Sequence, residues 1–230
     1  MQTELHTNPI QTSVNLSMQV SEQGIRFQDA ELISWKQTSK QVSDYLKSID
    51  LQASQVQKLI IEIIHPSFLM LPDAYNDPLY RIAFLEKALG EHCMDGQELH
   101  EQACSNVESA LLYLIPSYWK DQLAILFPLA NIQYTHLLGN EIAKSKLYIH
   151  PRIQVYLQEQ HAYVTYFQHG RLQLINVFPY EHELALAYYL HSIRDTFNIP
   201  WNQESIRMHG PEASDAKLIA DLIRLNIPLS

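Results

Sequence analysis

The scarcity and spacing of glycine constrain this chain more than any other feature. Only six glycines occur in 230 residues, and the two nearest, Gly90 and Gly96, have five residues between them. This spacing excludes the dinucleotide-binding fingerprint, the phosphate loop of P-loop NTPases and the nucleophile elbow of α/β-hydrolases, because each needs glycines at a fixed, shorter spacing. The chain therefore lacks the commonest sequence motifs for nucleotide binding and acyl transfer.

The charge of the chain argues against nucleic acid as a partner. Sixteen lysines and arginines against 25 aspartates and glutamates give a net charge of −9, and no basic stripe is visible that would grip a phosphate backbone. Apolar residues make up 47% of the chain, which is enough for a sizeable core in one large domain or two small ones.

We expect a cytoplasmic protein without a transmembrane segment. Two cysteines, Cys93 and Cys104, cannot form a disulfide framework, which suits a reducing compartment. The longest apolar run, residues 123–130, contains a proline and is far shorter than the roughly 18 residues that span a bilayer. The first ten residues lack the basic and apolar regions of a secretory signal.

Hydrophobic periodicity predicts the elements of the first half. Apolar residues alternate with polar ones on both sides of a turn at residues 21–24, a pattern typical of a β-hairpin. Residues 42–49 have the spacing of an amphipathic helix, and the apolar residues 59–64 predict a strand buried on both faces. Further on we expect a strand, a short helix and another strand at residues 109–115, 117–128 and 131–138.

The clearest helix signal in the sequence lies between Asp77 and Gly90. Asp77 can cap the free amides, and Pro78 has the backbone angle of a first helical turn. Gly90 lies where a left-handed C-terminal cap is needed. We expect one face of this helix to be buried, namely Ile82, Leu85 and Leu89.

The second half predicts three antiparallel strands, a helix, a short strand and a last helix. Their expected ranges are 153–158, 162–167, 172–174, 186–197, 206–208 and 218–222. A β-meander followed by alternating helices and strands is typical of the ribonuclease H-like fold, an α/β fold with a mixed sheet. We therefore expect two such halves, residues 1–143 and 144–230, joined by a polar stretch at residues 140–146, as in the duplicated actin-like architecture.

One stretch of the second half resembles a known family. Residues 169–180 read His-Gly-Arg-Leu-Gln-Leu-Ile-Asn-Val-Phe-Pro-Tyr, followed by the pair Tyr188-Tyr189 and by Met208-His209-Gly210. This order is similar to that of an uncharacterised bacterial family described only as a domain of unknown function. The family is distantly similar to actin-like ATPases such as the pilus-assembly protein PilM. Because no catalytic residues are established for it, the resemblance assigns no catalytic residue to this chain.

The resemblance also implies where a nucleotide would bind, and the residues there do not match. Active actin-like proteins hold the phosphates with an aspartate and glycines in the first hairpin of each half. We place these hairpins at residues 19–24 and 148–152, and neither contains the Asp-x-Gly signature. Pro151 even removes a backbone donor. We therefore predict a non-catalytic, degenerate actin-like module for binding or scaffolding, with no cofactor.

In an alternative interpretation the chain still binds a nucleotide. In it the chain is an actin-like ATPase with atypical phosphate contacts from Ser21, Asn176 and His209. The double glycine on the adenosine side of the family pattern is reduced here to Gly210.

Two further clusters have the residue types of chemical sites. His92-Cys93, His100 and Cys104 could present zinc ligands, the last two from one helical face. The four residues lie in one short segment, however, so ordinary buried side chains explain them better, and we predict no metal. Glu181-His182-Glu183 could supply a base and an orienting acid, although acidic residues at a helix start need no catalytic explanation.

Tyrosine suggests where a protein partner could bind. Seven of thirteen tyrosines fall between residues 148 and 189. They either pack beneath helices or form a surface for a protein partner, since tyrosine combines a large apolar area with a polar tip. We expect a protein partner through this half, and a homo-oligomer stays open.

Overall fold

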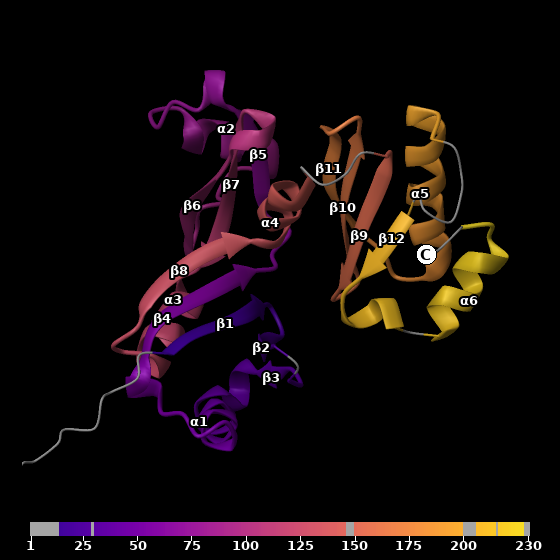
Figure 1. Ribbon diagram of the computed structural model, residues 1–230. Coiled ribbons are helices and arrows are strands. Elements are labelled where there is room, and N and C mark those ends of the chain that lie inside the picture. The colour runs from indigo at the N-terminus through magenta and orange to yellow at the C-terminus, as the bar shows by residue number, and fades with distance from the viewer. Residues whose placement is uncertain (1–13, 29, 146–149, 200–205, 215, 228–230) are drawn as a thin grey trace, which may run out of the picture. The chain divides into compact units, whose positions relative to one another are not determined.

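The protein forms two compact units, each with its own mixed sheet (Figure 1). A computed structural model describes residues 14–28, 30–145, 150–199, 206–214 and 216–227. The first unit contains residues 1–64 and 115–135, and the second contains residues 65–114 and 136–230. The predicted halves, 1–143 and 144–230, stay a prediction.

The first unit is built on a five-stranded sheet in the order β3-β2-β1-β4-β8. Strand β1 pairs antiparallel with β2, which confirms the predicted hairpin, and parallel with β4. Helix α1 lies between β3 and β4 in the chain. The bounds are β1 Val14–Ser21, β2 Gly24–Phe27, β3 Ile33–Ser34, α1 Thr38–Ser48, β4 Val56–Ile63 and β8 Asn131–His136.

Aromatic contacts join helix α1 to the sheet of this unit and the 3-10 helix at Trp35 to helix α3. The rings of Phe27 on β2 and Tyr45 on α1 stack with centroids 4.2 Å apart. Trp35 stacks at 5.8 Å on Trp119, a fully buried residue of helix α3, Ser117–Leu126. Strand β4 departs from its prediction, because Ile60 is 36% exposed and, within the predicted range, only the face with Leu59, Ile61 and Ile63 is fully buried.

A smaller three-stranded sheet, in the order β5-β7-β6, carries helix α2. The helix begins at Arg81 rather than at Pro78, and Asp77 Oδ1 accepts a hydrogen bond from the backbone of Leu79. Leu85 is buried, but Ile82 is 48% exposed, so the predicted buried face is wrong at that position. The bounds are β5 Phe68–Pro72, α2 Arg81–Leu89, β6 Gln97–Cys104 and β7 Ser109–Pro116.

The remaining sheet belongs to the second unit and has the order β11-β10-β9-β12. Three antiparallel strands form the predicted meander, and β12 pairs parallel with β9. Helix α5 packs on this sheet through Leu186 and Leu190. The bounds are β9 Arg152–Gln158, β10 His161–Gln168, β11 Arg171–Pro179, α5 Glu183–Phe197, β12 Ile206–His209 and α6 Ala216–Arg224.

Two predictions about the middle of the chain are wrong. Strand β8 ends at His136, and residues predicted as its end and as a polar linker form helix α4, Leu137–Lys144. The first hairpin of the second half turns at Glu159 and Gln160, not at residues 148–152. Of that predicted hairpin, residues 148 and 149 lie outside the described residues, and Arg152 already belongs to β9.

Short 3-10 helices complete the described chain: Trp35–Gln37, Ala53–Gln55, Asp73–Tyr75, Ser105–Val107 and Pro211–Ser214. Within the described residues no helix is both long and apolar enough to cross a lipid bilayer.

Candidate functional site

The hairpin turn of the first unit packs against β3 and against Trp35, which follows β3. Ser21 is buried, and its backbone oxygen accepts a hydrogen bond of 2.9 Å from Trp35 Nε1. A Cβ atom on Gly24 would lie 2.0 Å from the backbone oxygen of Ile33. Gly24 is therefore needed for the close approach of β2 and β3, a use that involves no ligand.

At the hairpin of the second unit a carboxylate of the chain itself occupies the turn. Glu159 and Gln160 both have positive φ, 55° and 58°, as in the tight turns of two-residue hairpins. The backbone N–H of Gln160 donates to Glu212 Oε1 at 3.3 Å, and the hydroxyl of Tyr180 donates to Glu212 Oε2. Tyr180 is itself held by a backbone hydrogen bond, because its N–H donates to the backbone oxygen of Gln160 at 2.7 Å. Both carboxylate oxygens of Glu212 thus hold this turn closed.

An acidic pocket of about 310 Å³ opens beside this turn. Four carboxylates line it, and no lysine or arginine is among its described lining residues. Such a lining disfavours phosphate, because unscreened like charges repel at short range. The lining residues are Gln160, Tyr180, Glu181, His182, Glu183, Glu212, Leu218 and Asp221.

His182 and Glu183 of this pocket have structural positions at the start of α5. The ring Nδ1 of His182 accepts a hydrogen bond of 3.2 Å from the backbone of Ala185, which makes His182 the N-cap. Glu183 follows as the first helical residue, where a negative charge is stabilised by the helix dipole. This geometry favours the interpretation of the triplet as a helix start.

His209 and Gly210 lie together at the end of β12. His209 Nε2 and Gln154 Oε1 are 2.8 Å apart, and burial lowers the pKa of His209 below its ordinary value. Gly210 has φ +97°, and a Cβ atom there would lie 2.4 Å from the backbone oxygen of Leu157. This glycine therefore serves the close approach of β12 and β9.

Asn176 is not brought together with these two residues. It lies on β11, at the opposite edge of the sheet from β12. In the strand register Asn176 is level with Met208, at three strand spacings or about 14 Å. Its Oδ1 accepts a hydrogen bond of 2.9 Å from the next backbone N–H. Ser21 belongs to the first unit. Within the second unit, only His209 and Gly210 of the alternative interpretation are neighbours.

The residues considered as zinc ligands do not form a cluster. His100 and Cys104 lie on strand β6, where four residues span about 13 Å, and not on a helical face. Burial raises the pKa of the Cys104 thiol to about 11. Within the described part of the chain, no three His, Cys, Asp or Glu side chains gather in a way that could hold a metal ion.

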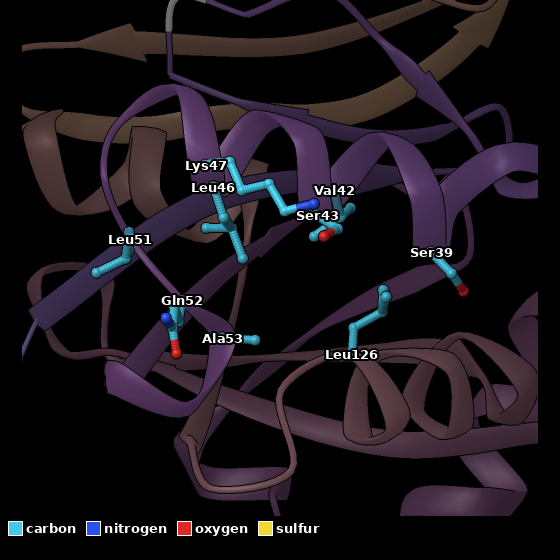
Figure 2. A pocket seen from close by; sticks show the side chains of 9 residues that line it. All are labelled: Ser39, Val42, Ser43, Leu46, Lys47, Leu51, Gln52, Ala53 and Leu126. Atoms are coloured by element: carbon cyan, nitrogen blue, oxygen red, sulfur yellow. The ribbon is translucent and has the colours of Figure 1, made fainter.

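A groove of about 170 Å³ lies on the first unit between α1 and α3 (Figure 2). Its floor is apolar, with Val42 and Leu46 from α1 and Leu126 from α3. Ser39, Ser43 and Lys47 of α1 also line it, along with Leu51 and Gln52 from the loop after α1 and Ala53 at the start of the next 3-10 helix. The groove is large enough for one side chain of a partner.

The described tyrosines of the second half differ in burial, and Tyr156 and Tyr189 are half-buried. Tyr163, Tyr166 and Tyr180 are buried, whereas Tyr188 is 69% exposed. Large exposed apolar side chains are instead concentrated between residues 75 and 84, at the start of α2. A protein partner through the tyrosines of the second half stays a prediction.

The sequence interpretation also missed Glu212. A signal for it exists, since an acidic residue follows the Gly-Pro break after the last strand. Nothing in that pattern indicates, however, that the carboxylate reaches a hairpin turn 52 positions earlier in the chain.

Residues 6–225 match the family described as "Protein of unknown function (DUF3822)". The chain belongs to the DUF3822 family. The sequence matches none of the curated proteins.

Solved structures show that this DUF3822 chain has an actin-like fold. A Bacteroides thetaiotaomicron protein with an actin-like ATPase fold and unknown function is similar with a TM-score of 0.69 at 15% identity, over 94% of this chain and 88% of that one. The PilM–PilN type IV pilus biogenesis complex contains a chain similar with a TM-score of 0.53 at 8% identity, over 94% and 87%. The cytoplasmic domain of EpsL from the type II secretion system of Vibrio cholerae gives 0.50 at 6%, over 86% and 82%.

Proposed function

We propose that this chain is a non-catalytic actin-like module of the cytoplasm that binds another protein and acts as a scaffold. One observation carries the proposal: the carboxylate of Glu212 holds the turn of the second-unit hairpin.

The position of this carboxylate disfavours a nucleotide. In actin-like ATPases the phosphates lie at the hairpin turns, where backbone N–H groups donate to anionic oxygens. Here the N–H of Gln160 already donates to Glu212, and Tyr180 donates to the other oxygen. A phosphate would have to displace Glu212 and then lie among the carboxylates of the same pocket.

A binding role for the module is supported by its neighbours and by its surface. One similar structure is a pilus biogenesis complex of PilM with PilN, and another is a component of a secretion system. The groove of the first unit offers an apolar floor, and Lys47, which also lines it, forms no ion pair among the described residues. A partner side chain that is large and apolar, beside a carboxylate, would match this groove.

Titration with magnesium ATP tests the proposal. A site with a Kd of about 10 µM would stabilise the fold by about 2.7 kcal/mol at about 1 mM ATP, and the melting temperature would rise by several degrees. We expect a rise of less than about 1 °C and no heat of binding. Micromolar binding of ATP with magnesium-dependent turnover would overturn the proposal. It would favour the ATPase with contacts from Ser21, Asn176, His209 and Gly210.

Two variants separate the role of Glu212 from that of overall charge. Glu212→Ala frees the Gln160 amide, whereas Glu181→Ala removes a charge from the same pocket without touching the turn. We expect only Glu212→Ala to gain a measurable shift with ATP. An equal gain in both variants would contradict the role assigned to this carboxylate.

A further inference from the structure

Five large apolar side chains lie exposed around the start of α2. They are Tyr75, Leu79, Tyr80, Ile82 and Phe84, here called the α2 surface, with exposed fractions of 64%, 84%, 58%, 48% and 37%. All five fall within ten consecutive residues of the segment that leads into and begins α2 (Figure 1). Single exposed apolar side chains are ordinary, but such a concentration marks an interaction site.

The segment that carries the α2 surface is fixed in place. Leu85 anchors the helix in a small core with Leu71 and Leu112. Arg81 forms an ion pair of 2.9 Å with Glu101 on β6, and its Nε donates to Asn76 at 2.8 Å. Because the backbone is held from beneath, little ordering entropy would be lost when the outer side chains are covered.

The exposed area fits a contact between two copies of the chain. At about 200 Å² for each fully exposed large side chain, the five exposed fractions leave about 600 Å². Two such surfaces facing each other would bury at most about 1,200 Å², when all five side chains of both copies are covered, and this is the lower limit for specific interfaces. Large apolar and aromatic residues are also the composition that distinguishes homodimer interfaces from transient ones.

The local charge also permits two copies to meet. Residues 73–89 carry Asp73, Asp77 and Glu86 against Arg81 and Lys87, whereas the whole chain has a net charge of −9. The α2 surface is thus close to neutral, so that identical copies would face each other there without concentrated like charge.

We propose that the α2 surface is the interface of a homodimer. Two copies associate about a two-fold axis, each covering the other's Leu79 and Tyr80. The small area makes the dimer weak, with a Kd on the order of 10–100 µM. The inference goes beyond the proposed function, and it holds whether or not the chain binds a nucleotide.

Sedimentation equilibrium between about 1 and 300 µM tests the dimer. We expect the average mass of the full chain to rise toward twice 26.7 kDa over this range. The double variant Leu79→Glu/Tyr80→Glu should have a clearly lower average mass than the unmodified chain at every concentration, with Kd raised at least tenfold. Its matched control is Ile125→Glu/Leu129→Glu, because these residues are 70% and 68% exposed in and just after α3.

The control variant should dimerise like the unmodified chain. A melting curve shows that both variants are folded, which they should be since all four side chains are largely exposed. A monomer at 300 µM would overturn the proposal, and the α2 surface would then belong to a different protein. Equal weakening in both double variants would overturn it as well.

Discussion

The chemistry of the His136 side chain is strongly altered by its surroundings. It is completely buried, and its Nε2 lies 3.0 Å from the backbone oxygen of His65. Its Nδ1 accepts from the backbone N–H of Leu138 and thereby caps α4. With one nitrogen donating and the other accepting, the ring fits this site only in its neutral form.

This environment makes folding stability depend on pH. Burial lowers the pKa of His136 from 6.5 to about 4. Above pH 6.5 the ring is neutral in both the folded and the unfolded chain. Between pH 6.5 and 4 only the unfolded chain takes up the proton, so stability falls as pH falls. From pH 7 to 5 we expect His136 to lower the free energy of unfolding by about 2 kcal/mol.

Urea unfolding at pH 7 and pH 5 measures this loss. His136→Gln keeps a donor and an acceptor but cannot titrate, so the variant should lose about 2 kcal/mol less between these pH values. His92→Gln is the control, because the side chain of His92 is 80% exposed. An unchanged pH dependence in His136→Gln would contradict the prediction.

At the scale of elements, the spacing of apolar residues predicted the strands and helices that have one clearly buried face. The hairpin of β1 and β2, the meander of β9 to β11 and helix α5 are examples. Strand β6 was missed because its residues, Gln97–Cys104, are mostly polar and none but Cys104 is buried. Helix α4 was missed because its first turn is apolar and continues the pattern of β8.

The close contact of β12 with β9 gives a prediction at this scale. Gly210→Ala places a Cβ atom at 2.4 Å from the Leu157 oxygen, and the strands would have to separate. We expect a loss of about 2–4 kcal/mol in the free energy of unfolding. Gly170→Ala is the control, because it has φ +71° with no atom within 4 Å. Backbone strain alone should cost about 1 kcal/mol there.

Chemical unfolding of both variants measures the difference. Equal losses in the two would show that φ, and not the approach of the strands, requires glycine at position 210. The result also matters for nucleotide tests, since any substitution of Gly210 changes the fold before it changes a ligand contact.

At the scale of the whole molecule, the order of elements was enough to indicate the actin-like fold class, which the similar solved structures confirm. The candidate site was less predictable. The phosphate-binding hairpin of the second half was placed at residues 148–152, before strand β9 instead of after it, because Glu159 and Gln160 are not residues typical of a turn with positive φ. The bond from Gln160 to Glu212 joins residues 52 apart, a distance over which local patterns carry no information.

The net charge of −9 gives a prediction at this scale. Two copies repel through their overall charge while the α2 surfaces attract through apolar contact. Raising sodium chloride from about 30 to 300 mM shortens the range of the repulsion from about 18 Å to about 6 Å. We therefore expect the Kd of the dimer to fall severalfold, measured by sedimentation equilibrium. A Kd that rises with salt would indicate an interface held by opposite charges and would contradict the apolar one.

The chain passes from one unit to the other three times, after Ile64, Leu114 and Thr135. No single cut therefore yields either unit, and a fragment of residues 1–64 lacks β8 and α3 together. During synthesis the first unit has to wait for residues 115–135, which emerge only after the whole of the small sheet with α2. That sheet can form while the first unit is still incomplete. The apolar α2 surface, at residues 75–84, is therefore synthesised before the first unit can be completed.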